Sequence, residues 1–80
     1  MPSLSYTTLV MLPDNSTVEV QYYCIDKKLD KEERKTKTEL FIQLHDCICT
    51  IKIEKSVCTN PEVLESLVQH KVINTRGHLC

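Results

Sequence analysis

The stretch Thr38-Glu-Leu-Phe-Ile-Gln-Leu-His-Asp-Cys-Ile-Cys-Thr-Ile-Lys-Ile-Glu54 decides the fold, because its two halves match around a two-residue turn, His45-Asp46. The resulting hairpin has two faces. On the first face the pairs are Leu44 with Cys47, Ile42 with Cys49, Leu40 with Ile51 and Thr38 with Ile53. On the second face they are Gln43 with Ile48, Phe41 with Thr50 and Glu39 with Lys52. The first face is apolar except for its threonine, and the second is mostly polar. Because side chains alternate along a strand, a one-residue slip would destroy this agreement. The sequence therefore predicts a β-hairpin over residues 38–54 with this register.

The residues before this hairpin predict a second one. Residues 6–12 and 17–24 are rich in side chains that favour strands, and the four residues 13–16 between them, Pro-Asp-Asn-Ser, are typical of a turn. With Pro13 opposite Ser16, the facing pairs are Met11 with Val18, Leu9 with Val20 and Thr7 with Tyr22. This register predicts a second apolar face that includes Leu9 and Met11.

Residues 26–37 are almost all charged, and Leu29 is their one apolar side chain. We interpret them as an exposed connection or a short surface helix. A helix over residues 30–44 is the alternative, because it would gather Leu40, Phe41 and Leu44 on one side and give a ββαβα order. The β-branched and aromatic residues near Phe41 favour the strand instead.

A C-terminal helix is predicted over residues 60–73. The segment Thr59-Asn-Pro-Glu62 offers a cap and a proline in the first turn. Apolar residues with helical spacing follow at Val63, Leu64, Leu67, Val68 and Val72. The chain is thus predicted to be an α+β protein, in which two β-hairpins form a four-stranded antiparallel sheet with one C-terminal helix on its apolar face. The predicted inner face is Leu9, Met11, Val18, Val20, Leu40, Ile42, Ile51, Ile53, Leu64, Leu67 and Val68.

Length and charge limit the function. A chain of 80 residues is expected to form a single small domain over residues 1–80, with a flexible tail at 74–80. It buries only about 60% of its unfolded surface, so stability is expected to depend on a cross-link or a partner. The net charge of −1 argues against a whole-chain polyanion binder and favours self-association. Because no signal-peptide pattern or long apolar stretch is visible, we expect a cytoplasmic or nuclear protein.

Five cysteines raise the question of metal or disulfide chemistry. In a reducing compartment all five would be thiols, and the simplest interpretation of Cys47 and Cys49 is that they are small core residues. A zinc module is one alternative, with candidate ligands His45, Cys47, Cys49, Cys58, His78 and Cys80. A secreted, disulfide-linked chain is another, and then the glycosylation triplet Asn15-Ser16-Thr17 would become relevant.

The charged segment suggests a further alternative. Nucleic acid would be bound by its cationic side chains, with an aromatic ring for stacking. The candidate residues are Lys28, Lys31, Arg34 and Lys35. Acidic residues are interleaved with them, so a solvated surface is the simpler interpretation.

A small sheet covered by one helix has one uncovered face and two open edges, and such surfaces bind other chains. We expect no enzymatic activity and no cofactor, since so small a fold rarely encloses a catalytic pocket. The favoured hypothesis is a protein-protein interaction module or small accessory protein that binds another protein and forms a homodimer. Its predicted interaction surface is Tyr23, Phe41, Ile48 and Thr50.

Overall fold

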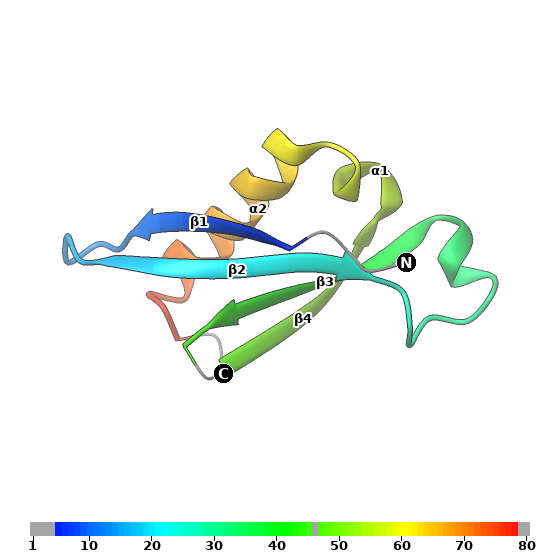
Figure 1. The fold of residues 1–80 in the computed structure, drawn as a ribbon, viewed down its shortest axis with the longest axis horizontal. Coiled ribbons are helices and arrows are strands. Elements are labelled where there is room, and N and C mark those ends of the chain that lie inside the picture. The colour runs from blue at the N-terminus through cyan, green and yellow to red at the C-terminus, as the bar shows by residue number, and fades with distance from the viewer. Residues whose placement is uncertain (1–4, 46, 79–80) are drawn as a thin grey trace.

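The computed structural model of the chain describes residues 5–45 and 47–78. Its four strands form one antiparallel sheet in the order β1-β2-β3-β4, which confirms the predicted α+β fold (Figure 1). The elements are β1 (Tyr6–Met11), β2 (Thr17–Ile25), the 3-10 turn η1 (Glu33–Lys35), β3 (Lys37–Leu44), β4 (Cys47–Glu54), α1 (Lys55–Cys58) and α2 (Pro61–Asn74). Every connection within the sheet joins neighbouring strands.

The β3–β4 hairpin has the predicted register in every pair, from Leu44 with Cys47 to Thr38 with Ile53. On β3 the inward side chains are all buried, and the outward ones are half-buried. His45 occupies the turn with a φ of 57°, a conformation that histidine tolerates better than most residues. Asp46 lies outside the described residues. The alternative helix over residues 30–44 is wrong, because the alternation of buried side chains with period two selects the strand.

The predicted register of the β1–β2 hairpin is wrong by one residue. Leu9 faces Glu19 and Met11 faces Thr17, so the inward side chain at this end of β1 is Val10. Because a shift of one residue reverses the two faces, Leu9 and Met11 point outward and are 67% and 62% exposed. Their assignment to the inner face is therefore also wrong.

The turn between β1 and β2 explains this shift. Its loop has three residues, Pro13 to Asn15, rather than two: the Leu12 N–H donates to the Ser16 carbonyl at 2.8 Å, and the Asn15 N–H donates to the Leu12 carbonyl at 2.9 Å. Asn15 has a φ of 69°, as expected for the last residue of a three-residue hairpin loop. The Asp14 carboxylate accepts from the Ser16 backbone N–H and hydroxyl, and these bonds lower the pKa of Asp14.

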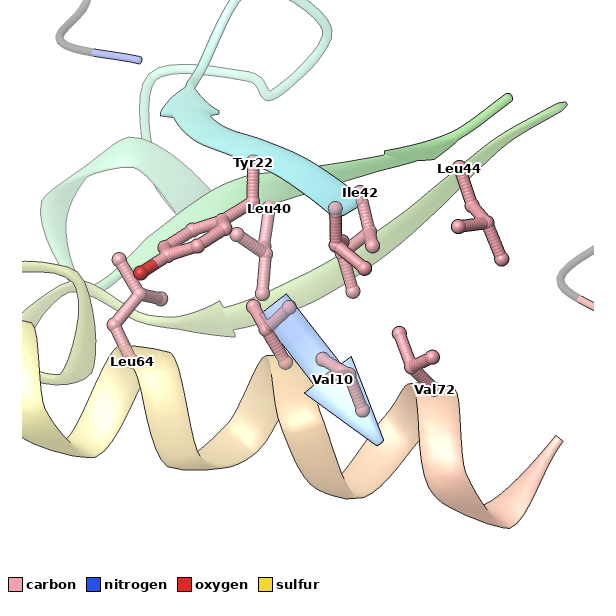
Figure 2. Packing of buried hydrophobic residues seen from close by; sticks show 9 residues of the cluster. Val10, Tyr22, Leu40, Ile42, Leu44, Leu64 and Val72 are labelled. Carbon is pink, nitrogen blue, oxygen red and sulfur yellow. The ribbon is translucent and has the colours of Figure 1, made fainter. Parts of the chain in front are cut away.

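The core lies between the sheet and α2 (Figure 2). Its buried members are Val10, Val20, Tyr22, Leu40, Ile42, Leu44, Leu64, Val68 and Val72. The predicted members Val18, Ile51, Ile53 and Leu67 are half-buried and pack against this cluster. The inward residues of β4 are only half-buried, whereas those of β3 are buried, so the cover that α2 provides is thinner at β4.

Most of the charged connection is exposed, Asp26 and Glu33 are half-buried, and Leu29 is buried at 6% exposure. After it, the Asp30 carboxylate accepts from the Glu33 N–H at 2.8 Å and starts the short 3-10 turn. Glu33 forms an ion pair with Lys52 on β4, which ties the connection to the sheet. The expected short surface helix is thus a single 3-10 turn.

Helix α2 begins and ends as its sequence suggests. The Asn60 side chain accepts from the Val63 N–H at 3.4 Å, and Pro61 occupies the first helical position. At the other end, the Gly77 N–H donates to the Val72 carbonyl at 3.0 Å. Gly77 has a φ of 82°, which closes the helix in a left-handed C-terminal turn. These bonds attach residues 75–78 to the helix, and flexibility of the tail stays a prediction.

The Gly77 turn provides the first testable prediction. A Cβ at this position would lie 3.3 Å from Leu12 Cδ1, in a backbone region that side chains disfavour. We expect Gly77→Ala to lower the free energy of unfolding by about 1–2 kcal/mol, the cost of a left-handed alanine. Urea denaturation measures this change, and Asn74→Ala, at an exposed residue near the end of α2, is the control. Equal stability of the two variants would contradict the role of this turn.

Candidate protein-interaction surface

The face of the sheet that α2 leaves uncovered carries the predicted interaction residues. Tyr23 and Phe41 are paired across β2 and β3, and their rings stack with centroids 5.1 Å apart and planes 2° apart. Phe41 in turn pairs with Thr50 on β4. Ile48, one step away on the same face of β4, is 53% exposed. The structure thus brings all four residues onto one surface, while their role in binding stays a prediction.

Polar side chains surround the aromatic pair. Two outward neighbours of Tyr23 and Phe41 along their strands are Gln21 and Gln43, which pair with each other, and Glu39 pairs with Lys52. Hydrogen bonding to Glu33, and then the charge of Glu33, raises the pKa of Lys52, so this lysine keeps its positive charge. A flat partner that covered the whole face would therefore have to remove water from several charged groups, which is unfavourable without matching charges.

The two edge strands differ in character. Strand β1 contains no charged residue and no proline, and its outward Leu9 and Met11 are the two most exposed large apolar side chains among the described residues. Strand β4 carries Lys52 and Glu54, both held in ion pairs with other elements. Natural sheets protect open edges with charges, prolines or bulges. Because β4 has charges and β1 has none of these features, β1 is the less protected of the two edges.

Sequence reasoning missed Leu9 and Met11 as surface residues. The error came from the assumed two-residue turn, which assigned them to the core. The signal that could have corrected it is Asn15, a residue that tolerates positive φ and so fits the last position of a three-residue loop. We call the strand Tyr6–Met11 the β1 edge, and Leu9 and Met11 are its outward apolar side chains.

The candidate zinc ligands are not gathered at one place. Cys58 forms a disulfide with Cys24, which joins α1 to the end of β2, and Cys47 is also disulfide-bonded. A sulfur in a disulfide is not a thiolate ligand, so neither serves zinc in this oxidised state. Cys49 is a half-buried free thiol, and His45 and His78 are exposed. Cys80 lies outside the described residues, and within 5–45 and 47–78 no group of three potential ligands is close enough to hold a metal.

The cross-link corrects the expectation that all five cysteines are thiols. Cys24 and Cys58 have Cα atoms 6.6 Å apart, within the range that a disulfide spans. The sequence pattern could not show this pair, because it depends on how α1 folds back beside the end of β2.

The candidate nucleic-acid residues lie on the connection between β2 and β3. Lys28, Lys31, Arg34 and Lys35 are all exposed. Lys35 forms an ion pair with Glu32 at 3.2 Å, and further carboxylates alternate with the other cations. The Tyr23 and Phe41 rings stack on each other, so each already uses one ring face. A nucleic-acid role stays an alternative prediction.

Family models, curated proteins and solved structures were compared with the chain, and none matches it. Among the helices of the described residues, none has the length and apolar character needed to cross a membrane.

Proposed function

We propose that this protein is a non-enzymatic protein-interaction module that forms a homodimer by pairing the β1 edges of two chains. The observation that carries this proposal is the exposure of Leu9 and Met11 on an uncharged edge strand. An unguarded edge presents a row of backbone donors and acceptors that a second strand satisfies. A second copy is the partner that supplies such a strand without any further requirement.

Charge supports self-pairing in particular. Two β1 strands related by a two-fold axis run antiparallel, and no like charges meet within the strand pair, because Tyr6–Met11 has no ionised side chain. A register centred on Leu9 would place the two Leu9 side chains together, with each Met11 opposite a Thr7. The low net charge of the chain adds little repulsion between the copies.

The remaining surfaces fit this arrangement. A two-fold axis perpendicular to the sheet keeps the uncovered faces of both chains on the same side. The two four-stranded sheets would form one eight-stranded sheet, and both Tyr23–Phe41 stacks would lie on the same face of it. On the opposite side, the Thr8 hydroxyl donates to Glu65 of α2 at 2.9 Å, so the two α2 helices would flank the new strand pair. The predicted surface of Tyr23, Phe41, Ile48 and Thr50 would remain available to another protein.

A charge placed on the β1 edge tests the proposal. We expect Leu9→Lys to raise the dimer dissociation constant at least about tenfold, because it removes an apolar contact and opposes two positive charges across the axis. Sedimentation velocity over a range of concentrations measures this shift. The matched control is Val63→Lys, which charges a 46% exposed apolar residue on α2 instead. Equal association of the two variants would contradict the β1 edge as the contact.

A further inference from the structure

The hairpin turn at residues 12–16 carries a modification sequence that the proposed function does not use. Asn15-Ser16-Thr17 has the form Asn-x-Thr, and it is the chain's one triplet of the type Asn-x-Ser/Thr without proline in the middle. Its significance depends on whether the acceptor amide is accessible and whether the chain folds in a compartment where glycosylation occurs. The structure provides observations on both.

The Asn15 side chain is exposed at the tip of the β1–β2 hairpin. The neighbouring Asp14 carboxylate accepts both hydrogen bonds from Ser16, so the Asn15 amide is not needed to hold the turn. Within the part of the chain that the structure describes, no side chain bonds to the Asn15 amide. The Thr17 side chain is exposed as well. Both groups that define the acceptor triplet are thus accessible.

The cysteines point to the compartment. Cys24 and Cys58 are joined in a disulfide, and Cys47 is disulfide-bonded too. Disulfides form and persist in oxidising environments, such as the lumen of the endoplasmic reticulum, and are rare in the cytosol. Asparagine-linked glycans are surface additions typical of proteins that pass through that lumen. The disulfides are a feature of the fold and the triplet is a feature of the sequence, and the two independently indicate the same environment.

We propose that Asn15 is the acceptor of an asparagine-linked glycan. The donor class is an oligosaccharide linked to a polyprenyl diphosphate. The Asn15 Nδ2 forms a bond to the anomeric carbon, the bond between that carbon and the diphosphate oxygen breaks, the amide nitrogen loses one proton, and the polyprenyl diphosphate leaves.

The position of Asn15 allows a bulky addition. Thr17, the first residue of β2, lies six positions before Tyr23, about 20 Å along the strand at a rise of ~3.3 Å per residue, and Asn15 lies beyond Thr17 in the turn. The glycan would therefore project from the end of the sheet, away from the Tyr23–Phe41 stack. It would cover the tip of the hairpin, where Pro13 and Asp14 are also exposed.

Expression of the full chain behind a cleavable secretory leader in a eukaryotic host tests this proposal. We expect the secreted protein to lose mass on treatment with a peptide N-glycosidase, with Asn15 converted to aspartate in the released peptide. Asn15→Gln and Thr17→Ala should each abolish the mass change completely. Thr17→Ser, which keeps the hydroxyl, should retain it. Translation with microsomal membranes gives the same readout where secretion is poor.

The same samples show what would overturn the proposal. A secreted chain that contains the Cys24–Cys58 disulfide but has the mass of the bare polypeptide would contradict it. So would a mass change that persists in Asn15→Gln. Protein isolated from its own source cells provides a second measurement, in which an unmodified Asn15 in every molecule would also overturn the assignment.

Discussion

Leu40→Ala is expected to lower the free energy of unfolding by about 3–4 kcal/mol, the typical cost of a Leu→Ala cavity in a well-packed core. Leu40 has no exposed surface and lies on the central strand β3. It packs within the cluster that also holds Leu64 and Val68 of α2. Neither the sheet nor the helix can move into the space without losing other contacts. Urea denaturation monitored by circular dichroism measures the change.

Leu9→Ala is the matched control, because it removes the same atoms from a leucine that is 67% exposed. We expect the free energy of unfolding of the monomer to change by no more than about 0.5 kcal/mol, as is usual at surface sites. The comparison must be made at concentrations where the chain is monomeric, since Leu9 is also part of the proposed dimer contact. A larger loss of unfolding free energy for Leu9→Ala than for Leu40→Ala would contradict the observed pairing of Leu9 with Glu19 and support the predicted pairing of Leu9 with Val20.

Removal of the Cys24–Cys58 cross-link is expected to lower the free energy of unfolding by about as much as Leu40→Ala does. The two cysteines are 34 positions apart, and the loop-closure model assigns a disulfide of that span about 3–4 kcal/mol of stabilisation through the unfolded chain. The effect is large for a domain of 80 residues, whose total stability is expected to be small. The double variant Cys24→Ser/Cys58→Ser, unfolded in urea beside the unchanged chain, measures it.

Cys49→Ser is the control for this experiment, because Cys49 is a free, half-buried thiol. We expect Cys49→Ser to lower the free energy of unfolding by under about 1 kcal/mol, since the change is nearly isosteric at a site that is not fully buried. Peptide mapping without reduction identifies the bonded pair directly. A double variant as stable as Cys49→Ser, or a map in which Cys24 and Cys58 are never linked, would contradict this part of the structure.

The two hairpins show where sequence patterns suffice. Residues 38–54 have polar and apolar side chains that separate cleanly, so only one register gives an apolar face, and that register is observed. In β1 the apolar side chains fall on both faces, with Leu9 and Met11 on one and Val10 on the other. The alternation therefore cannot select a register, and the length of the turn decides it. This ambiguity also hid the exposed side chains that now define the β1 edge.

The candidate surface was predictable only in part. Tyr23, Phe41, Ile48 and Thr50 share a face because β2 pairs with β3. The alternation within each hairpin predicted that these side chains point away from the core, but the pairing of the two hairpins was only a condition of the prediction. The Cys24–Cys58 bond was not predictable, since it joins a strand end to a short helix whose position depends on tertiary packing. Local patterns determine which way a side chain points, whereas contacts between distant segments require the complete fold.

The native mass of the unchanged chain tests the central claim most directly. Sedimentation equilibrium should be run without reductant, after the free thiols have been alkylated so that no cross-link forms between chains. Pairing of two β1 edges predicts a concentration-dependent, non-covalent species of twice the 9.3 kDa chain mass. A mass of one chain at every concentration up to the millimolar range would contradict the proposed homodimer.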